Sequence, residues 1–115
     1  MKLTLDHTQR LNLHALLGAQ RVDVAGVRAI WAIQDKLALD SAEEKTLELK
    51  RELVAGQERV LWNPALSIPV KEFDFADAEV ARMKVAIEMW NHYSATADRR
   101  WLEPLVDEFL SAEPR

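Results

Sequence analysis

Histidine is the most versatile chemical side chain in this sequence, and it occurs as His7, His14 and His92. A zinc pair on one helix requires ligands about four residues apart, as in the H-E-x-x-H arrangement. His7 and His14 are seven residues apart, which is two helical turns and about 10 Å. Because each metal–nitrogen bond is about 2 Å long, one ion cannot bridge them on a continuous helix. The spacing therefore predicts no metal site.

The other reactive side chains are placed where structural roles explain them. The acidic residues fall at helix starts and on solvated helix faces, and they do not form a convergent pair for acid–base work. The serines lack the strand–turn–helix context of a nucleophile, and no glycine-rich loop precedes a helix in a form that binds phosphate. The chain has no cysteine, which excludes thiol chemistry and cysteine-bound metals. We predict no catalytic residue, no cofactor and no enzymatic activity.

Tryptophan offers the best candidates for a binding surface, with four copies in 115 residues. Trp31 and Trp90 lie on apolar helix stripes, which predicts that both belong to the core. Trp62 ends a β-rich run, and Trp101 directly follows two arginines. Trp and Arg are the residues enriched at binding hot spots. We therefore predict an interaction surface that includes Trp62, Arg99, Arg100 and Trp101.

The N-terminal half of the chain predicts two amphipathic helices and a helical turn. Apolar residues recur at helical spacing from Asp6 to Leu17, and Gly18 is expected to end this helix in a left-handed conformation. A second helix follows an N-cap at Asp23 and continues through Ala38. The run Ser41-Ala42-Glu43-Glu44 matches a capping box and predicts a short third helical segment.

The middle of the chain favours strands. Leucines alternate with charged residues from 47 to 53, and the run Ala55-Gly56-Gln57-Glu58 provides a reversal before Val60, Leu61 and Trp62, so a hairpin is expected. Ile68, Val70, Phe73 and Phe75 indicate a further strand. These segments predict one small antiparallel sheet of about three strands.

Two helices are expected after this sheet. Val80, Met83, Ile87 and Trp90 follow one helix face, and a second helix spans residues 98–110 with Pro104 near its start or at a kink. Residues 111–115 are expected to fray. With no linker or repeat, the chain is predicted to form a single domain over residues 1–115 in the α+β class.

The order of the expected elements and the cations of the hairpin suggest nucleic-acid binding as an alternative function. Two helices, a short helix and a hairpin resemble a winged helix, in which the hairpin contacts DNA phosphate. The cations that would make this contact are Lys50, Arg51 and Arg59. However, Ser41 to Lys45 carries two acids where a recognition helix would begin, and the net charge of the chain is −4. The sequence therefore favours a nucleic-acid role less than protein association.

The chain also resembles a group of small phage and prophage proteins without assigned activity. The resemblance is carried by the helix at Arg10 to Leu17, the acidic run at Ser41 to Glu44, the order of Val60-Leu61-Trp62-Asn63 and Lys71 to Phe75, and the two closing helices. Gly18-Ala19-Gln20 and the stretch Ala65 to Pro69 depart from that pattern. The resemblance implies an accessory, assembly or host-interaction protein, and it carries over no functional residue.

These observations lead to one expected function. The first residues reach Asp6 before an apolar run forms, so we expect no signal peptide, no membrane association and a cytoplasmic location. We predict a non-enzymatic protein that acts by protein–protein association, with another protein or with a second copy of itself. The winged-helix reading is kept as the alternative.

Overall fold

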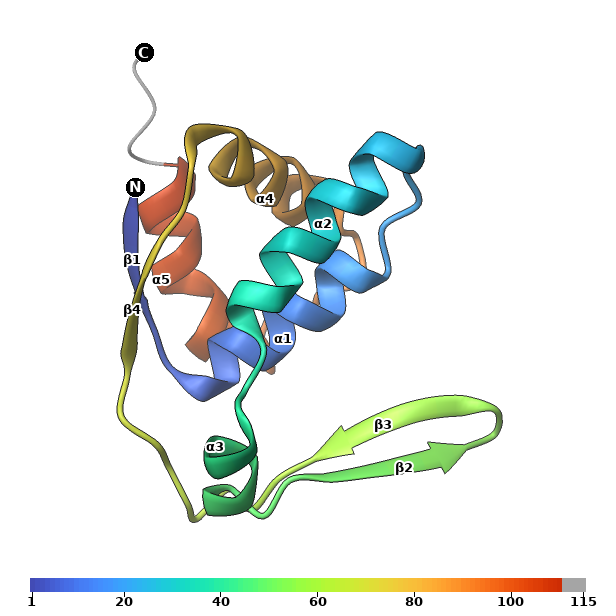
Figure 1. Cartoon of the computed structure of the whole chain (residues 1–115), viewed down its shortest axis with the longest axis vertical. Helices are drawn as coiled ribbons and strands as arrows, with labels where there is room; N and C mark the ends of the chain where they lie inside the picture. Colours follow the sequence, from blue (N-terminus) through green and yellow to red (C-terminus); the bar gives the residue numbers. More distant parts are fainter. Residues whose placement is uncertain (111–115) are drawn as a thin grey trace.

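The computed structural model describes residues 1–110, apart from the side chains of residues 57, 58 and 110, and this part of the chain forms an α+β fold (Figure 1). The predicted fold class is therefore confirmed, while residues 111–115, for which fraying is expected, lie outside the described residues. In chain order the elements are β1 (Lys2–Leu5), α1 (His7–Gly18), α2 (Val24–Leu37), α3 (Ser41–Thr46), β2 (Lys50–Val54), β3 (Gln57–Leu61), β4 (Lys71–Asp74), α4 (Asp77–Met89) and α5 (Arg99–Leu110).

The strands form two separate two-stranded sheets, which corrects the prediction of one sheet with about three strands. β2 pairs with β3 as the expected hairpin, whereas β4 pairs antiparallel with β1, a strand that the sequence does not predict. In β1 the side chains alternate, so that Leu3 and Leu5 are buried and Lys2 and Thr4 are exposed. Leu3 lies opposite Phe73 of β4. This pairing joins the start of the chain to the segment that precedes α4.

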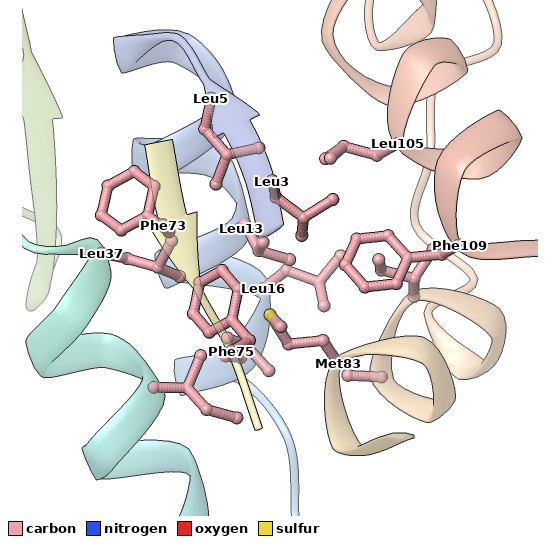
Figure 2. Close-up of a cluster of buried hydrophobic side chains, with 14 of the residues drawn as sticks. Leu3, Leu5, Leu13, Leu16, Leu37, Phe73, Phe75, Met83, Leu105 and Phe109 are labelled. Atoms are coloured by element: carbon pink, nitrogen blue, oxygen red, sulfur yellow. The ribbon is translucent and has the colours of Figure 1, made fainter. Parts of the chain in front are cut away.

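One hydrophobic core joins the β1–β4 ribbon to α1, α2, α4 and α5. Figure 2 shows side chains from the two strands converging with those of the helices. The exposed fraction of Leu13 on α1 and of Met83 on α4 is 0%. The buried members of this core are Leu3, Leu5, Leu13, Leu16, Leu17, Ile30, Ile33, Leu37, Phe73, Phe75, Met83, Ala86, Ile87, Trp101, Leu105 and Phe109.

The helix stripes confirm one tryptophan prediction and correct another. Trp90 is partly buried against the core at the end of α4, as expected. Trp31 on α2 is 59% exposed, so the prediction of a core position is wrong. The stripe that faces the core runs through Ile30, Ile33 and Leu37. Because residue 31 is rotated by about 100° from residue 30 on a helix, it points away from this stripe.

Side-chain caps fix where α1, α2 and α3 begin. Asp6 accepts a hydrogen bond from the Gln9 backbone N–H at 2.8 Å, and the Gln9 side chain accepts from Asp6 N–H in return. At α3 the capping residue is Asp40, which accepts from the Glu43 N–H at 2.7 Å. The predicted capping box at Ser41 and Glu44 is therefore displaced by one residue, because the carboxylate of Asp40 caps the helix in place of the Ser41 hydroxyl.

Gly18 has a different role from the expected one. It is the last helical residue of α1, and its φ is not positive, so α1 does not end in a left-handed glycine. A Cβ at this position would lie 2.9 Å from Nε2 of Gln34 on α2. The Gln34 amide donates a hydrogen bond to the carbonyl of His14 at 3.1 Å. Gly18 thus permits the close packing of α2 on α1.

The hairpin of β2 and β3, residues 50–61, forms an arm that extends from the α3 end of the molecule, away from α4 and α5 (Figure 1). We call it the hairpin arm. Its two-residue turn is Ala55-Gly56, with φ values of 52° and 80°. Positive φ at both positions is what a type I′ turn requires, and this turn matches the twist of the strands. All five residues of β2 are exposed.

Candidate interaction surface

The four residues of the predicted interaction surface have different environments. Trp101 is 7% exposed and belongs to the hydrophobic core, where its indole N–H donates to Oδ1 of Asp98 at 3.0 Å. Trp62 is half-buried, with its ring edge-on to His7 at 6.3 Å between centroids. Arg99 and Arg100 are exposed at the start of α5. Trp101 therefore supports the fold, and most of its ring is not available to a partner.

Three of these residues nevertheless line one hollow. Trp62, Arg100 and Trp101 surround a space of about 650 Å³, together with the loop at 64–68 and the first turn of α1. His7 also lines it, and Nδ1 of His7 is buried without a hydrogen-bond partner within the described residues. Arg99 is directed elsewhere and donates to Glu103 at 2.6 Å. The structure thus groups Trp62, Arg100 and Trp101 and separates Arg99 from them.

Four exposed apolar side chains lie on the hairpin arm, for which the sequence predicts only the alternative role of contact with DNA phosphate. Leu53 is 77% exposed, Val54 43%, Val60 36% and Leu61 42%. β2 and β3 pack chiefly against each other and contribute none of the buried members of the core. The alternation of apolar and charged residues in the sequence predicts a strand with one buried face. In this chain both faces are solvated.

Lys50, Arg51 and Arg59, the candidates for contact with nucleic acid, are all exposed on the hairpin arm. Two of these cations lie next to acidic side chains. Arg51 forms an ion pair of 2.5 Å with Glu44 of α3, and Arg59 lies directly across the ladder from Glu52. The arm therefore presents interleaved charges of both signs rather than the continuous basic stripe that gives strong phosphate affinity.

A groove of about 330 Å³ separates the hairpin arm from α1 and is lined by Arg51, Val60 and Trp62 on one side. His14 and Ala15 of α1 lie on the other side. Burial and the positive charge of Arg51 lower the pKa of His14 below its ordinary value, while Asp35 acts in the opposite direction. The groove thus places the charge of Arg51 near His14.

Arg10 joins α1 to the corner between α2 and α3, and no pattern in the sequence indicates this role. Arg10 is 1% exposed, and its guanidinium donates to the carbonyls of Leu37 and Ala38 at 3.1 and 2.9 Å. It also forms a bidentate ion pair with Glu43, in which Nη1 and Nη2 of Arg10 lie 2.7 and 3.2 Å from the two carboxylate oxygens. The hydrogen bond from Arg10 lowers the pKa of Glu43. One side chain therefore caps the end of α2 and fixes the start of α3.

No group of three or more histidine and acidic side chains within residues 1–110 could hold a metal ion. None of the helices in this part of the chain combines the length and apolar character needed to cross a membrane.

Comparison of the chain with protein-family models, with curated proteins and with solved structures found no match.

Proposed function

We propose that this protein acts by protein–protein association and that the hairpin arm is its main docking surface. The observation that carries the proposal is the group of exposed apolar side chains on the arm, with Leu53 77% exposed and Val54, Val60 and Leu61 each at least 36% exposed. Leu53 and Val60 lie on one face of the arm, and Val54 and Leu61 lie on the other. Exposed apolar side chains on a projecting element favour a site that another protein covers.

The arm's composition is not explained by its own stability. An isolated two-stranded hairpin is at best marginally stable in water, and side chains that pack against a further layer are what stabilise larger sheets. Leu53 and Val60 have no such layer among the described residues, and the core of the molecule is complete without them. A partner that covers the arm would supply the missing layer and bury these side chains.

The arm is continuous with part of the surface predicted from the tryptophans. Trp62 follows β3 directly and lines both the groove beside α1 and the hollow that contains Arg100. A half-buried indole of this kind combines a large apolar area with an N–H donor. We therefore include Trp62 and Arg100 at the edge of the proposed docking surface and leave Trp101 as their support.

The biological setting is part of the same proposal. The resemblance of the sequence to small phage and prophage proteins supports an accessory, assembly or host-interaction role without enzymatic activity. Such a role is carried out in the cytoplasm of the host cell.

Photo-crosslinking in cells that carry the gene tests this function. A photoreactive amino acid at Leu53 is expected to give a discrete covalent adduct, because the proposed partner covers that side chain. The control position is Val24 at the start of α2, which is 71% exposed but lies outside the proposed surface. Adducts at both positions in equal yield, or at neither, would contradict the proposal.

The projecting position of Lys50, Arg51 and Arg59 favours nucleic acid as the second candidate function. This candidate predicts retention of duplex DNA at low salt, with affinity that falls steeply as salt is added. Lys50→Ala is expected to weaken that binding at all DNA sequences alike, since phosphate contacts carry no sequence information. If wild-type protein does not shift duplex DNA at low salt, this candidate is removed.

A further inference from the structure

We infer that the partner of the hairpin arm is a second copy of this chain, joined through the free edge of β2 as an intermolecular antiparallel sheet. This inference rests on the proposed function, since it names the occupant of the same surface. It is carried by the topology of the arm and by a charge pattern in β2 that is complementary to itself.

The outer edge of β2 is available for pairing. The sheet contains only β2 and β3, so no other described strand covers this edge. Val54 and Gln57 flank the two-residue turn and form the closing pair of the ladder. Because hydrogen-bonded and non-hydrogen-bonded pairs alternate along an antiparallel ladder, the backbone groups of Arg51 and Leu53 are directed away from β3. These are the residues through which a further strand is added.

Only certain registers allow two β2 strands to pair. Residues whose backbone groups face outward must lie opposite each other, so when most of β2 overlaps its copy a two-fold axis passes through Arg51, Glu52 or Leu53. With the axis at Leu53, the two Leu53 side chains face each other and Glu52 faces Val54, so no charged residue opposes another. With the axis at Glu52, the two Glu52 side chains lie opposite each other and Lys50 faces Val54. With the axis at Arg51, Lys50 of each copy faces Glu52 of the other. Leu53 then lies beside Leu49, which precedes β2 and whose own N–H donates to the Glu44 carbonyl at 2.9 Å.

The charges select the register centred on Arg51. It forms two opposite-charge cross-strand pairs, whereas the axis at Leu53 forms none and the axis at Glu52 brings two carboxylates together. Like charges directly opposite each other destabilise a sheet. The two Arg51 side chains meet at the axis, but each is held in an ion pair with Glu44 of its own chain at 2.5 Å. This pairing offsets their mutual repulsion.

Pairing of this kind also addresses the arm's lack of support. Two hairpins joined through β2 form a four-stranded sheet, in which each hairpin gains the backbone hydrogen bonds of a further strand. Leu53, the most exposed large apolar residue, then lies against Leu49 of the other copy. The symmetric contact closes after two copies, because both chains use the same edge.

Charge-exchange variants test the register directly. Sedimentation of the full chain over about 1 to 200 μM is expected to show twice the 13.1 kDa chain mass for the wild type. Lys50→Glu and Glu52→Lys should each weaken self-association about tenfold or more, because each places like charges opposite each other twice. An equimolar mixture of the two variants should restore the dimer, since position 50 of one chain then again opposes the opposite charge at position 52 of the other.

Proline variants test which edge is used. Leu53→Pro removes an N–H on the outer edge of β2 without removing a bond within the hairpin, and it is expected to yield monomers. Val60→Pro makes the matched change on the outer edge of β3 and should leave the dimer in place. Far-UV circular dichroism and the thermal midpoint check that both variants keep the helical body, to which neither residue contributes.

The outcomes separate this inference from the broader function. A monomeric wild type across the stated range, a mixture that fails to associate, or equal loss of dimer in the two proline variants would overturn the second copy as occupant. If the Leu53 crosslink in cells then contains only a different protein, the proposed function stands and this inference fails. If that position gives no adduct either, both fail.

Discussion

The helical body and the hairpin arm of this protein use apolar residues in opposite ways. In the body, Leu13 and Met83 are completely buried, and side chains from both chain ends meet in one core. In the arm, Leu53 and Val54 are exposed although they belong to the same residue classes. The two regions are joined at α3, where Arg10 and Glu43 fix the geometry. Composition alone therefore does not separate residues that maintain the fold from residues available for binding.

This difference has a thermodynamic consequence. Burial of apolar surface from water is the main source of stability, so the body accounts for nearly all of it. The arm can change without loss of the body, because its ladder is local in sequence and adds no side chain to the buried core. Substitutions in the two regions should thus separate stability from association.

Removal of Arg10 should have the largest effect on the body. Arg10→Ala leaves the Glu43 carboxylate and the carbonyls of Leu37 and Ala38 without their partner in a site where Arg10 is 1% exposed. Breaking a buried ion pair from one side is strongly destabilising, and we expect a loss of about 4 kcal/mol in the free energy of unfolding. Urea denaturation followed by circular dichroism measures it.

An exposed arginine provides the control for this prediction. Arg99 forms a comparable ion pair with Glu103, but its side chain is 75% exposed. Arg99→Ala should change the urea midpoint little, since solvent screens such pairs. Similar midpoints for the Arg10 and Arg99 variants would show that the buried arginine does not hold α2 and α3 together.

A matched pair of leucine substitutions compares the two regions directly. Leu13→Ala is expected to lower the free energy of unfolding by about 3 kcal/mol, because it removes buried methyl groups and leaves a cavity. Leu53→Ala should lower it by less than about 0.5 kcal/mol, since the side chain is already solvated. Chemical denaturation at a concentration low enough to keep the chain monomeric makes the comparison valid. A large loss for Leu53→Ala would place the arm within the cooperative core.

Local patterns in the sequence were sufficient for most of the helices and for the hairpin. The apolar stripe identifies α4, and the N-cap at Asp23 identifies α2. Each of these signals is contained in a few neighbouring residues of the sequence. The turn at Ala55-Gly56 was located for the same reason. The pairing of β1 with β4 was not predictable in this way. Lys2–Leu5 contains only four residues, and its partner lies about 70 residues further along the chain.

The candidate site was less predictable than the fold. Trp101 was placed on a surface because two arginines precede it, although its spacing from Leu105 and Phe109 already indicates the buried face of a helix. Arg10 carried no local signal, since its partners belong to the α2–α3 corner and become neighbours only after folding. The exposure of the arm could not be read from its alternating pattern, because that pattern does not show whether a second layer exists.

The turn of the arm allows a smaller, local test. Ala55 has φ of 52°, a left-handed conformation that disfavours residues with a Cβ, so Ala55→Gly should stabilise the hairpin by about 1 kcal/mol. Gly56→Ala is the matched opposite change, at φ of 80° in open space, and should destabilise it by a similar amount. Amide hydrogen exchange over residues 50–61 measures both effects. If protection in the helices changes equally, the arm and the body do not unfold separately.

The smallest expected effect lies in the groove where the two regions face each other. Arg51→Gln should raise the pKa of His14 towards its ordinary value, because it removes a positive charge that disfavours protonation. Asp35→Asn should lower the same pKa, since that carboxylate acts in the opposite direction. Titration of the His14 ring protons by NMR measures both shifts. If neither substitution moves the His14 titration, the arm does not face α1 as described.

The same shift predicts how stability depends on pH. The pKa of His14 is lower in the folded protein than the ordinary value of 6.5. Below that value the unfolded chain binds more protons than the folded one, so this group's contribution to stability is complete above about pH 6.5 and is lost as the pH falls. In Arg51→Gln the folded pKa lies closer to the unfolded one, and the loss between about pH 6.5 and 5.5 should be smaller. Urea unfolding at these two pH values then shows whether the charge of the arm reaches the body through His14.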